Sequence, residues 1–266
     1  MQKSNELNRE KRGQVSAEEV KQYVEASVAE LSVLLNSANP KERTIAATLI
    51  GDKKLTTIIP QLCQRIIREK SLYPRIAMSE ALGKIGEPAV IPVIALLGKI
   101  GANHEIELPQ KYFAKKSFPL ARDMAARTLV KIGKPAIPGL VEKITNGGQF
   151  EIQQALDAIG GIVSRTNDRR PLPILLQALT DYSANEITAW KIVRALSAFK
   201  CSEVVKPLTM MLAHIQPSIR WEAARSIGQV GISTPEAVKA LQNGLTDLNS
   251  EVRKAAKIAL EMILKE

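Results

Sequence analysis

The two tryptophans of the chain are each followed four residues later by an arginine, Trp190 by Arg194 and Trp221 by Arg225. On a helix, residues four apart lie on one face, so each guanidinium can lie across its indole ring in a cation–π contact. Trp and Arg are also enriched at binding hot spots. The pattern indicates a surface that binds a partner, although rings that fill space between neighbouring helices would give the same spacing.

Basic and aromatic side chains alternate in a second segment, between Pro109 and Pro119. They are Lys111, Tyr112, Phe113, Lys115 and Lys116. This composition suits phosphate contact with base stacking, but equally an acidic peptide. A loop folded over its own repeat and a disordered loop are further interpretations.

The residues that could support catalysis are few. His104 and Glu105 form one His-Glu pair. The only other histidine and cysteine side chains are His214, Cys63 and Cys201, which are too few for a zinc site or a disulfide framework. Glycines recur as helix terminators, and no phosphate loop or nucleophile elbow stands out. We therefore expect a non-enzymatic protein without cofactor or metal, and the two cysteines suit a reducing cytoplasm.

A repeat must position these residues. One pattern recurs along the chain: an arginine, then small residues one turn later, then a branched aliphatic residue followed by glycine. It is clearest from Arg75 to Gly86 and from Arg220 to Gly231. The copies are anchored at positions 43, 75, 122, 152, 189, 220 and 253, mostly about 30 to 37 residues apart, which is typical of two-helix solenoid units. Prolines suited to the first turn of the other helix recur at Pro60, Pro92, Pro138, Pro173 and Pro207. The sequence predicts about seven helix pairs, with an inserted loop at about 101–119.

The ends of the helices carry local signals as well. Ser16 with Glu19 has the spacing of a capping box, and Asn39 with Pro40 suits a cap and a first helical position. We expect a glycine in a left-handed conformation to end each second helix. The polar residues 1–15 read as a frayed tail without a signal peptide, and residues 16–266 as a single solenoid.

The stretches RIAMSEALGKIGEPAVIPVI and IRWEAARSIGQVG resemble the HEAT-like repeats first described in bilin lyases. The resemblance covers nearly the whole chain. It implies an all-α, right-handed α-α superhelix, an α-solenoid, with first helices outside and second helices lining a concave side. The repeat occurs in lyase subunits, scaffolds, iron-dependent hydroxylases and DNA glycosylases, so it implies a fold rather than a function.

In that geometry, the residues one and five after each anchor face the groove, which adds Arg127 and Asp157 to the Trp-Arg pairs. We expect Asp157 to pair with Arg127 or Arg194. The formal net charge of +10 favours an acidic partner, and the longest apolar stretch is too short to enter a membrane. We therefore expect an interaction or scaffold module that binds a protein partner in the concave groove. The alternative is a nucleic-acid-binding HEAT-like repeat protein, with a DNA glycosylase as its most specialised form.

Overall fold

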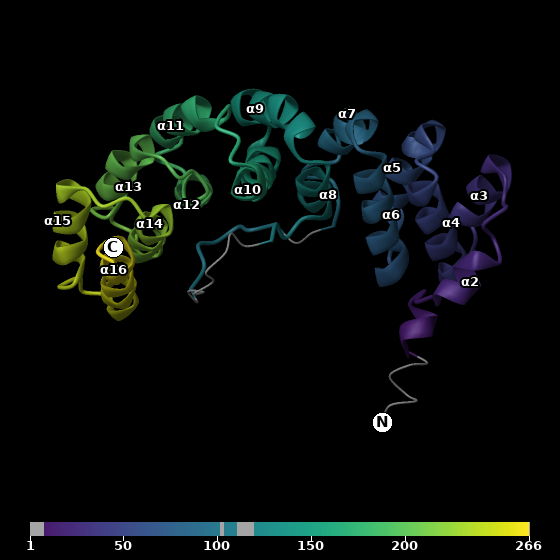
Figure 1. Ribbon diagram of the computed structural model, residues 1–266, viewed down its shortest axis with the longest axis horizontal. Helices are drawn as coiled ribbons and strands as arrows, with labels where there is room; N and C mark the ends of the chain where they lie inside the picture. The colour runs from purple at the N-terminus through teal and green to yellow at the C-terminus, as the bar shows by residue number, and fades with distance from the viewer. Residues whose placement is uncertain (1–7, 102–103, 111–119, 266) are drawn as a thin grey trace. The chain divides into compact units, whose positions relative to one another are not determined.

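The computed structural model describes residues 8–101, 104–110 and 120–265, and within these ranges the chain contains helices and no strands (Figure 1). After the short helix α2 (Ala17–Lys21), seven helix pairs follow, as the repeat predicts. They are α3 (Val28–Leu35) with α4 (Pro40–Asp52), α5 (Ile59–Arg68) with α6 (Leu72–Ile85), α7 (Val90–Ile94) with α8 (Met124–Ile132), α9 (Ile137–Asn146) with α10 (Gln149–Thr166), α11 (Leu172–Asp181) with α12 (Glu186–Leu196), α13 (Val205–Met211) with α14 (Pro217–Val230), and α15 (Pro235–Gly244) with α16 (Ser250–Ile263). A single 3-10 turn precedes the first helix of four pairs, namely α5, α7, α9 and α13. These turns are Thr56–Ile58, Glu87–Ala89, Lys134–Ala136 and Ser202–Val204.

The described chain divides into two compact units, each built from helix pairs. Of the described residues, the first unit contains 8–101 and 122–139, and the second contains 104–110, 120–121 and 140–265. Within the first unit α4 packs on α6 and α6 on α8, and within the second α10, α12, α14 and α16 pack in succession. The second helices thus make one layer in each unit, and the first helices make the other (Figure 1). Two layers of paired helices are the arrangement that the resemblance implies.

The repeated arginine has a structural role in joining the two helices of a pair. Arg43, Arg220 and Arg253 each donate from Nη1 to the backbone carbonyls five and six residues earlier, in the turn before the second helix. A guanidinium satisfies carbonyls that a helix end leaves unpaired, and its charge suits the negative end of the helix dipole. At these three positions the anchor arginine therefore stabilises the turn between the two helices of a pair.

Local signals set the helix starts as predicted. The Ser16 hydroxyl accepts from the Glu19 amide while the Glu19 carboxylate accepts from the Ser16 amide, which completes the capping box. The Asn39 side chain accepts from the Lys41 amide, with Pro40 at the first helical position. Each contact satisfies a donor that the first turn would otherwise leave unpaired.

Glycines end three of the second helices, as predicted, and a fourth has another role. Gly86, Gly133 and Gly231 follow α6, α8 and α14 with φ angles of +82°, +85° and +74°, which favour glycine. Gly51 instead lies inside α4, where an added Cβ would come within 2.6 Å of the Ala81 Cα. Its prediction as a helix terminator is wrong, because its absent side chain lets α4 approach α6.

The start of the described chain packs against the first unit. Residues 8–11 are helical, and the Thr44 hydroxyl donates to the Gly13 carbonyl at 2.7 Å. The Tyr73 amide donates to the Arg12 carbonyl at 3.4 Å. Within the tail predicted over 1–15, hydrogen bonds to two helices therefore hold residues 12 and 13, and residues 1–7 lie outside the described chain.

Candidate functional site

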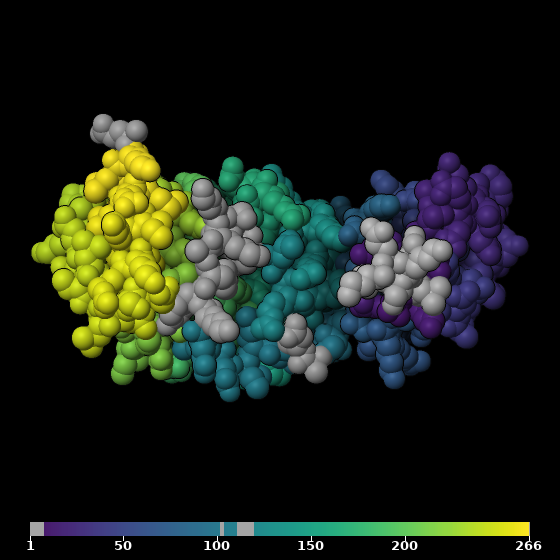
Figure 2. Space-filling view, turned by 90° about the horizontal axis from the view of Figure 1, so that it is seen from below, coloured from purple at the N-terminus to yellow at the C-terminus, as the bar shows by residue number. Residues whose placement is uncertain are grey.

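Residues 104–110, here called the inserted segment, connect α7 to α8 and lie against the second helices of the second unit. The His104 ring stacks on the Phe150 ring of α10, with centroids 4.1 Å apart and an angle of 13° between the planes. The Glu105 carboxylate forms an ion pair with Lys191 of α12. The Ser218 hydroxyl of α14 donates to the Pro109 carbonyl at 3.1 Å. The segment thus contacts three successive second helices, and Figure 2 views the molecule from the side on which it lies.

Buried charges lie next to this segment on α10 and α12. The Asp157 carboxylate accepts from Lys191 Nζ at 2.6 Å and from Arg194 Nη2, and all three side chains are buried. Burial raises the pKa of Asp157, but the charges of Arg194 and Lys191 and their hydrogen bonds outweigh it, so the pKa lies below its ordinary value. The prediction that Asp157 pairs with Arg194 is confirmed. Lys191 therefore joins Asp157 to Glu105 of the inserted segment.

A second buried ion pair lies on α14. Arg225 Nη1 donates to Glu222 Oε1 at 2.7 Å, and no part of Glu222 is exposed. We call the inner face the surface formed by Asp157, Lys191, Arg194, Glu222 and Arg225 together with the stacking residue Phe150. With Glu105 on it, this face carries three basic and three acidic side chains, so its formal charges sum to zero. Buried charges need such partners because desolvation of an unpaired ion is costly.

Both indole rings of the Trp-Arg pairs are buried. Trp190 is 1% exposed and Trp221 is 5% exposed. The Arg194 guanidinium lies 4.3 Å from the centroid of the Trp190 ring, which confirms the cation–π contact predicted for this pair. The rings thus fill space within the second unit, which is the second of the two interpretations that their spacing allowed. Contact of the rings with a partner stays a prediction.

Some buried polar atoms of the second unit have no hydrogen-bond partner among the described residues. They include Trp190 Nε1, Gln153 Nε2 and Glu222 Oε2. A buried polar group that makes no hydrogen bond costs about 1 to 3 kcal/mol, and such groups are rare in structural cores. These three atoms lie on α10, α12 and α14, and Arg65 Nε of α5 is a further such atom in the first unit.

The remaining candidate residues are Arg127 and the basic and aromatic side chains that follow Pro109. Arg127 is exposed on α8, which belongs to the first unit. The basic and aromatic side chains predicted to bind a ligand lie outside the described residues: Lys111, Tyr112, Phe113, Lys115 and Lys116. Their predicted roles stay predictions.

Three residues of the site were missed by the sequence analysis: Phe150, Lys191 and Glu222. Lys191 and Glu222 each directly follow a tryptophan. Both lie on second helices that the repeat predicts, so their elements could be predicted from the sequence. The partner of Lys191 could not be predicted from the sequence, because Glu105 lies in a loop whose path no periodicity specifies.

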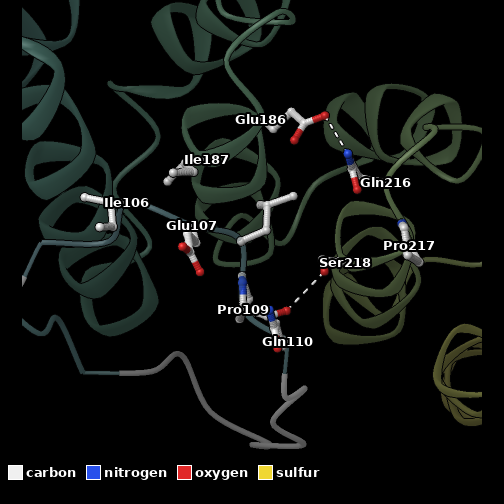
Figure 3. A pocket seen from close by; sticks show the side chains of 10 residues that line it. Ile106, Glu107, Pro109, Gln110, Glu186, Ile187, Gln216, Pro217 and Ser218 are labelled. Carbon is white, nitrogen blue, oxygen red and sulfur yellow. Dashed lines mark hydrogen bonds between the residues drawn. The ribbon is translucent and has the colours of Figure 1, made fainter.

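An open pocket lies where the inserted segment passes the starts of α12 and α14 (Figure 3). Its volume is ≈ 580 Å³, and its lining includes Glu107, Pro109, Glu186, Gln216 and Ser218. Gln216 Nε2 donates to the Glu186 carboxylate at 2.7 Å, which joins the two helix starts. The segment therefore touches this end of the unit at Ser218 without filling the space beside it.

A metal site and a membrane span each require a particular arrangement of side chains or helices. Among them, no group of three or more His, Cys, Asp or Glu side chains is arranged to hold a metal ion. His104 and Glu105 instead contact Phe150 and Lys191. In the same part of the chain, every helix is too short or too polar to span a bilayer.

Comparison with known proteins identifies the repeat. Residues 172–261 match the family described as HEAT repeats, and no curated protein sequence matches the chain. The chain is similar to a designed armadillo repeat protein solved in complex with the peptide (KR)4, with 19% identity, a TM-score of 0.50, and coverage of 90% of this chain and 100% of that one. At such an identity the likeness shows the fold alone.

Two further solved structures are similar over most of their length. One is human deoxyhypusine hydroxylase in complex with glycerol, with 19% identity, a TM-score of 0.40, and 93% and 89% of the two chains covered. The other is an engineered protein with 21% identity, a TM-score of 0.46, and 88% and 95% covered. The matched residues 172–261 run from the start of α11 into α16. Further helix pairs make up most of the rest of the described chain. Residues 172–261 therefore contain HEAT repeats, and the described chain has an all-α, armadillo-like fold.

Proposed function

We propose that this protein is a non-enzymatic, cytoplasmic scaffold whose second unit binds an extended segment of a protein partner on its inner face. One observation carries the proposal: this face already accommodates an extended polypeptide, the inserted segment. Along seven residues, that segment makes an aromatic stack, an ion pair and a hydrogen bond to its backbone. These contacts are of the kinds that hold an extended peptide in a groove.

The charges of the inner face favour a protein partner over nucleic acid. Lys191, Arg194 and Arg225 are each paired with a carboxylate, so a phosphate backbone would have to break buried ion pairs to reach them. Breaking a buried pair costs about 3 to 5 kcal/mol. A segment that presents one carboxylate to Lys191 would keep the other pairs intact.

Two further observations support the proposal. The designed armadillo repeat protein of similar fold was solved with a peptide bound. Cys63 and Cys201 are both buried free thiols, which suits a reducing compartment.

Affinity capture tests the proposed function. The immobilised chain would be exposed to native cell extract, and the bound protein identified and titrated against purified wild type, Lys191→Met and the control Lys254→Met, whose side chain is exposed on α16. Because a charge-assisted hydrogen bond is worth about 1.5 to 3 kcal/mol, we expect Lys191→Met to weaken binding roughly tenfold or more and the control to leave it unchanged.

The nucleic-acid alternative has its own result in this experiment. Retention on single-stranded or duplex nucleic acid that falls log-linearly with salt, together with no captured protein, would contradict the proposed function. A protein partner that binds wild type and Lys191→Met with equal affinity would place its binding site away from the inner face.

A further inference from the structure

We infer that the inserted segment is an internal ligand of the inner face, and that the partner binds by displacing it with an extended acidic segment of its own. This inference rests on the proposed function and names the partner's chemistry. The contact that defines the chemistry is the ion pair between Glu105 and Lys191. A displacing segment must supply the carboxylate that Glu105 supplies here.

The way in which the inserted segment is held suits displacement. Ile106 is 72% exposed, and Leu108, the other large aliphatic side chain of the segment, is only partly buried, so neither is a fully buried anchor. Its contacts with the second helices include an aromatic stack at His104, an ion pair at Glu105 and a hydrogen bond to the Pro109 carbonyl. A purely structural connection would be expected to bury its apolar side chains, since burial of one aliphatic side chain contributes about 1.5 to 3 kcal/mol.

The open pocket beside the inserted segment also favours displacement. Next to the inserted segment, ≈ 580 Å³ lies unfilled between Glu107, Pro109 and the starts of α12 and α14. This pocket is open to solvent, so a bulkier chain could occupy the space beside the segment. A partner segment with larger side chains at the positions of Leu108 and Pro109 would fit the face more completely.

The charge balance of the inner face specifies an acidic partner. Without Glu105, the basic side chains Lys191, Arg194 and Arg225 face the acidic side chains Asp157 and Glu222, which leaves a formal charge of 3 − 2 = +1. An uncompensated charge in a desolvated site is unfavourable, so the displaced state needs a new carboxylate at Lys191. A neutral or basic segment would not provide it.

A labelled peptide tests the inference without knowledge of the natural partner. The probe is a fluorescein-labelled peptide with the sequence HEIELPQ of residues 104–110, titrated by anisotropy into wild type and into a variant in which residues 104–110 are replaced by alternating Gly and Ser of equal length. A tethered segment has an effective concentration on the order of millimolar, so wild type should bind the probe weakly. If the segment covers the face about nine-tenths of the time, its removal raises probe affinity about tenfold.

Two controls define the specificity of the probe. The peptide HQIELPQ, which replaces the carboxylate by an amide, should bind the Gly/Ser variant about tenfold more weakly than HEIELPQ does. The variant Glu107→Gln, altered at an exposed carboxylate of the same segment, should bind the probe like wild type. Glu105→Gln should show a smaller rise in probe affinity than the full replacement.

Each other outcome overturns the inference. A folded Gly/Ser variant that binds the probe no better than wild type, or that binds both peptides equally, contradicts an acidic internal ligand. A variant that loses its helical circular dichroism shows that the segment is needed for the fold and is not displaced. A captured partner with the same affinity for wild type and the folded variant would overturn the inference alone, whereas absence of any captured protein with either would overturn the proposed function.

Discussion

Replacing Asp157 by asparagine removes one negative charge from the buried cluster on α10 and α12 while keeping the size of the side chain. In wild type this carboxylate accepts from Lys191 and from Arg194. In the variant, Lys191 keeps its pair with Glu105, but the Arg194 guanidinium loses the carboxylate that it contacts. The substitution therefore tests whether buried charge pairing stabilises the second unit.

The expected loss follows from the burial of these groups. Removing one partner of a buried ion pair costs about 3 to 5 kcal/mol, because the other charge stays desolvated. The asparagine carbonyl still accepts one hydrogen bond, so we expect the lower end, about 3 kcal/mol. The control Asp181→Asn alters an exposed carboxylate at the end of α11 in the same unit and should change the free energy of unfolding by less than about 0.5 kcal/mol.

Urea unfolding followed by tryptophan fluorescence measures this loss. Both tryptophans of the chain, Trp190 and Trp221, belong to the second unit, so their emission reports on that unit alone. The variant should unfold at a clearly lower urea concentration with a similar m-value. A loss below about 1 kcal/mol would refute the reasoning that pairing of Asp157 is important for stability.

Wild type and Asp157→Asn should also differ in how their free energy of unfolding depends on pH. Because the pKa of Asp157 is lowered in the folded state, its carboxylate stabilises the fold fully above its ordinary pKa, about 3.9. That stabilisation is lost as the pH falls through the lower folded-state pKa. The difference in unfolding free energy between wild type and Asp157→Asn should therefore be constant from pH 7 to about pH 5 and shrink below about pH 4. An unchanged difference at pH 3 would contradict the assignment.

Three further substitutions or reactions test the packing. Trp190→Ala should cost about 3 to 5 kcal/mol in urea unfolding followed by circular dichroism, since the ring is buried; a loss under 1 kcal/mol would show that the ring is not packed. Gly51→Ala should lower the thermal stability of the first unit by about 1 to 3 kcal/mol, because the new Cβ would lie 2.6 Å from the Ala81 Cα; an unchanged melting temperature would refute this close approach. Burial raises the pKa of the Cys63 thiol to about 11, so thiol reagents at pH 8 should modify it slowly in the folded protein and rapidly in urea; rapid modification without urea would contradict its burial.

The features that sequence predicted well are local ones. The capping box at Ser16 and the terminating glycines at Gly86 and Gly231 depend on contacts within a few residues, so their spacing contains the information. The anchors of the repeat identify the seven second helices for the same reason, because each copy has similar neighbours. Gly51 departed from the pattern because its role depends on Ala81 in the next repeat.

The candidate site was predicted only in part, because its decisive contact is not local. The register of Trp190 and Arg194 predicted their cation–π contact, and Asp157 was placed on the correct helix face. The sequence could not show that residues 104–110 lie across these helices, since a loop without periodicity does not specify its own path. The sequence analysis leaves Glu105 in a His-Glu pair that is too few ligands for a metal site, whereas in the structure its carboxylate pairs with Lys191.

Carboxyl footprinting of Glu105 tests the central claim most directly. In the chain alone, Glu105 is paired and partly buried, whereas Glu107 of the same proteolytic peptide is exposed and serves as an internal reference. Carbodiimide labelling, read by fragment mass spectrometry, would be compared for the free protein and for its complex with the captured partner. Displacement predicts that labelling of Glu105 rises to the level of Glu107 when the partner binds. Glu105 that stays protected in the saturated complex would contradict binding at the inner face by displacement.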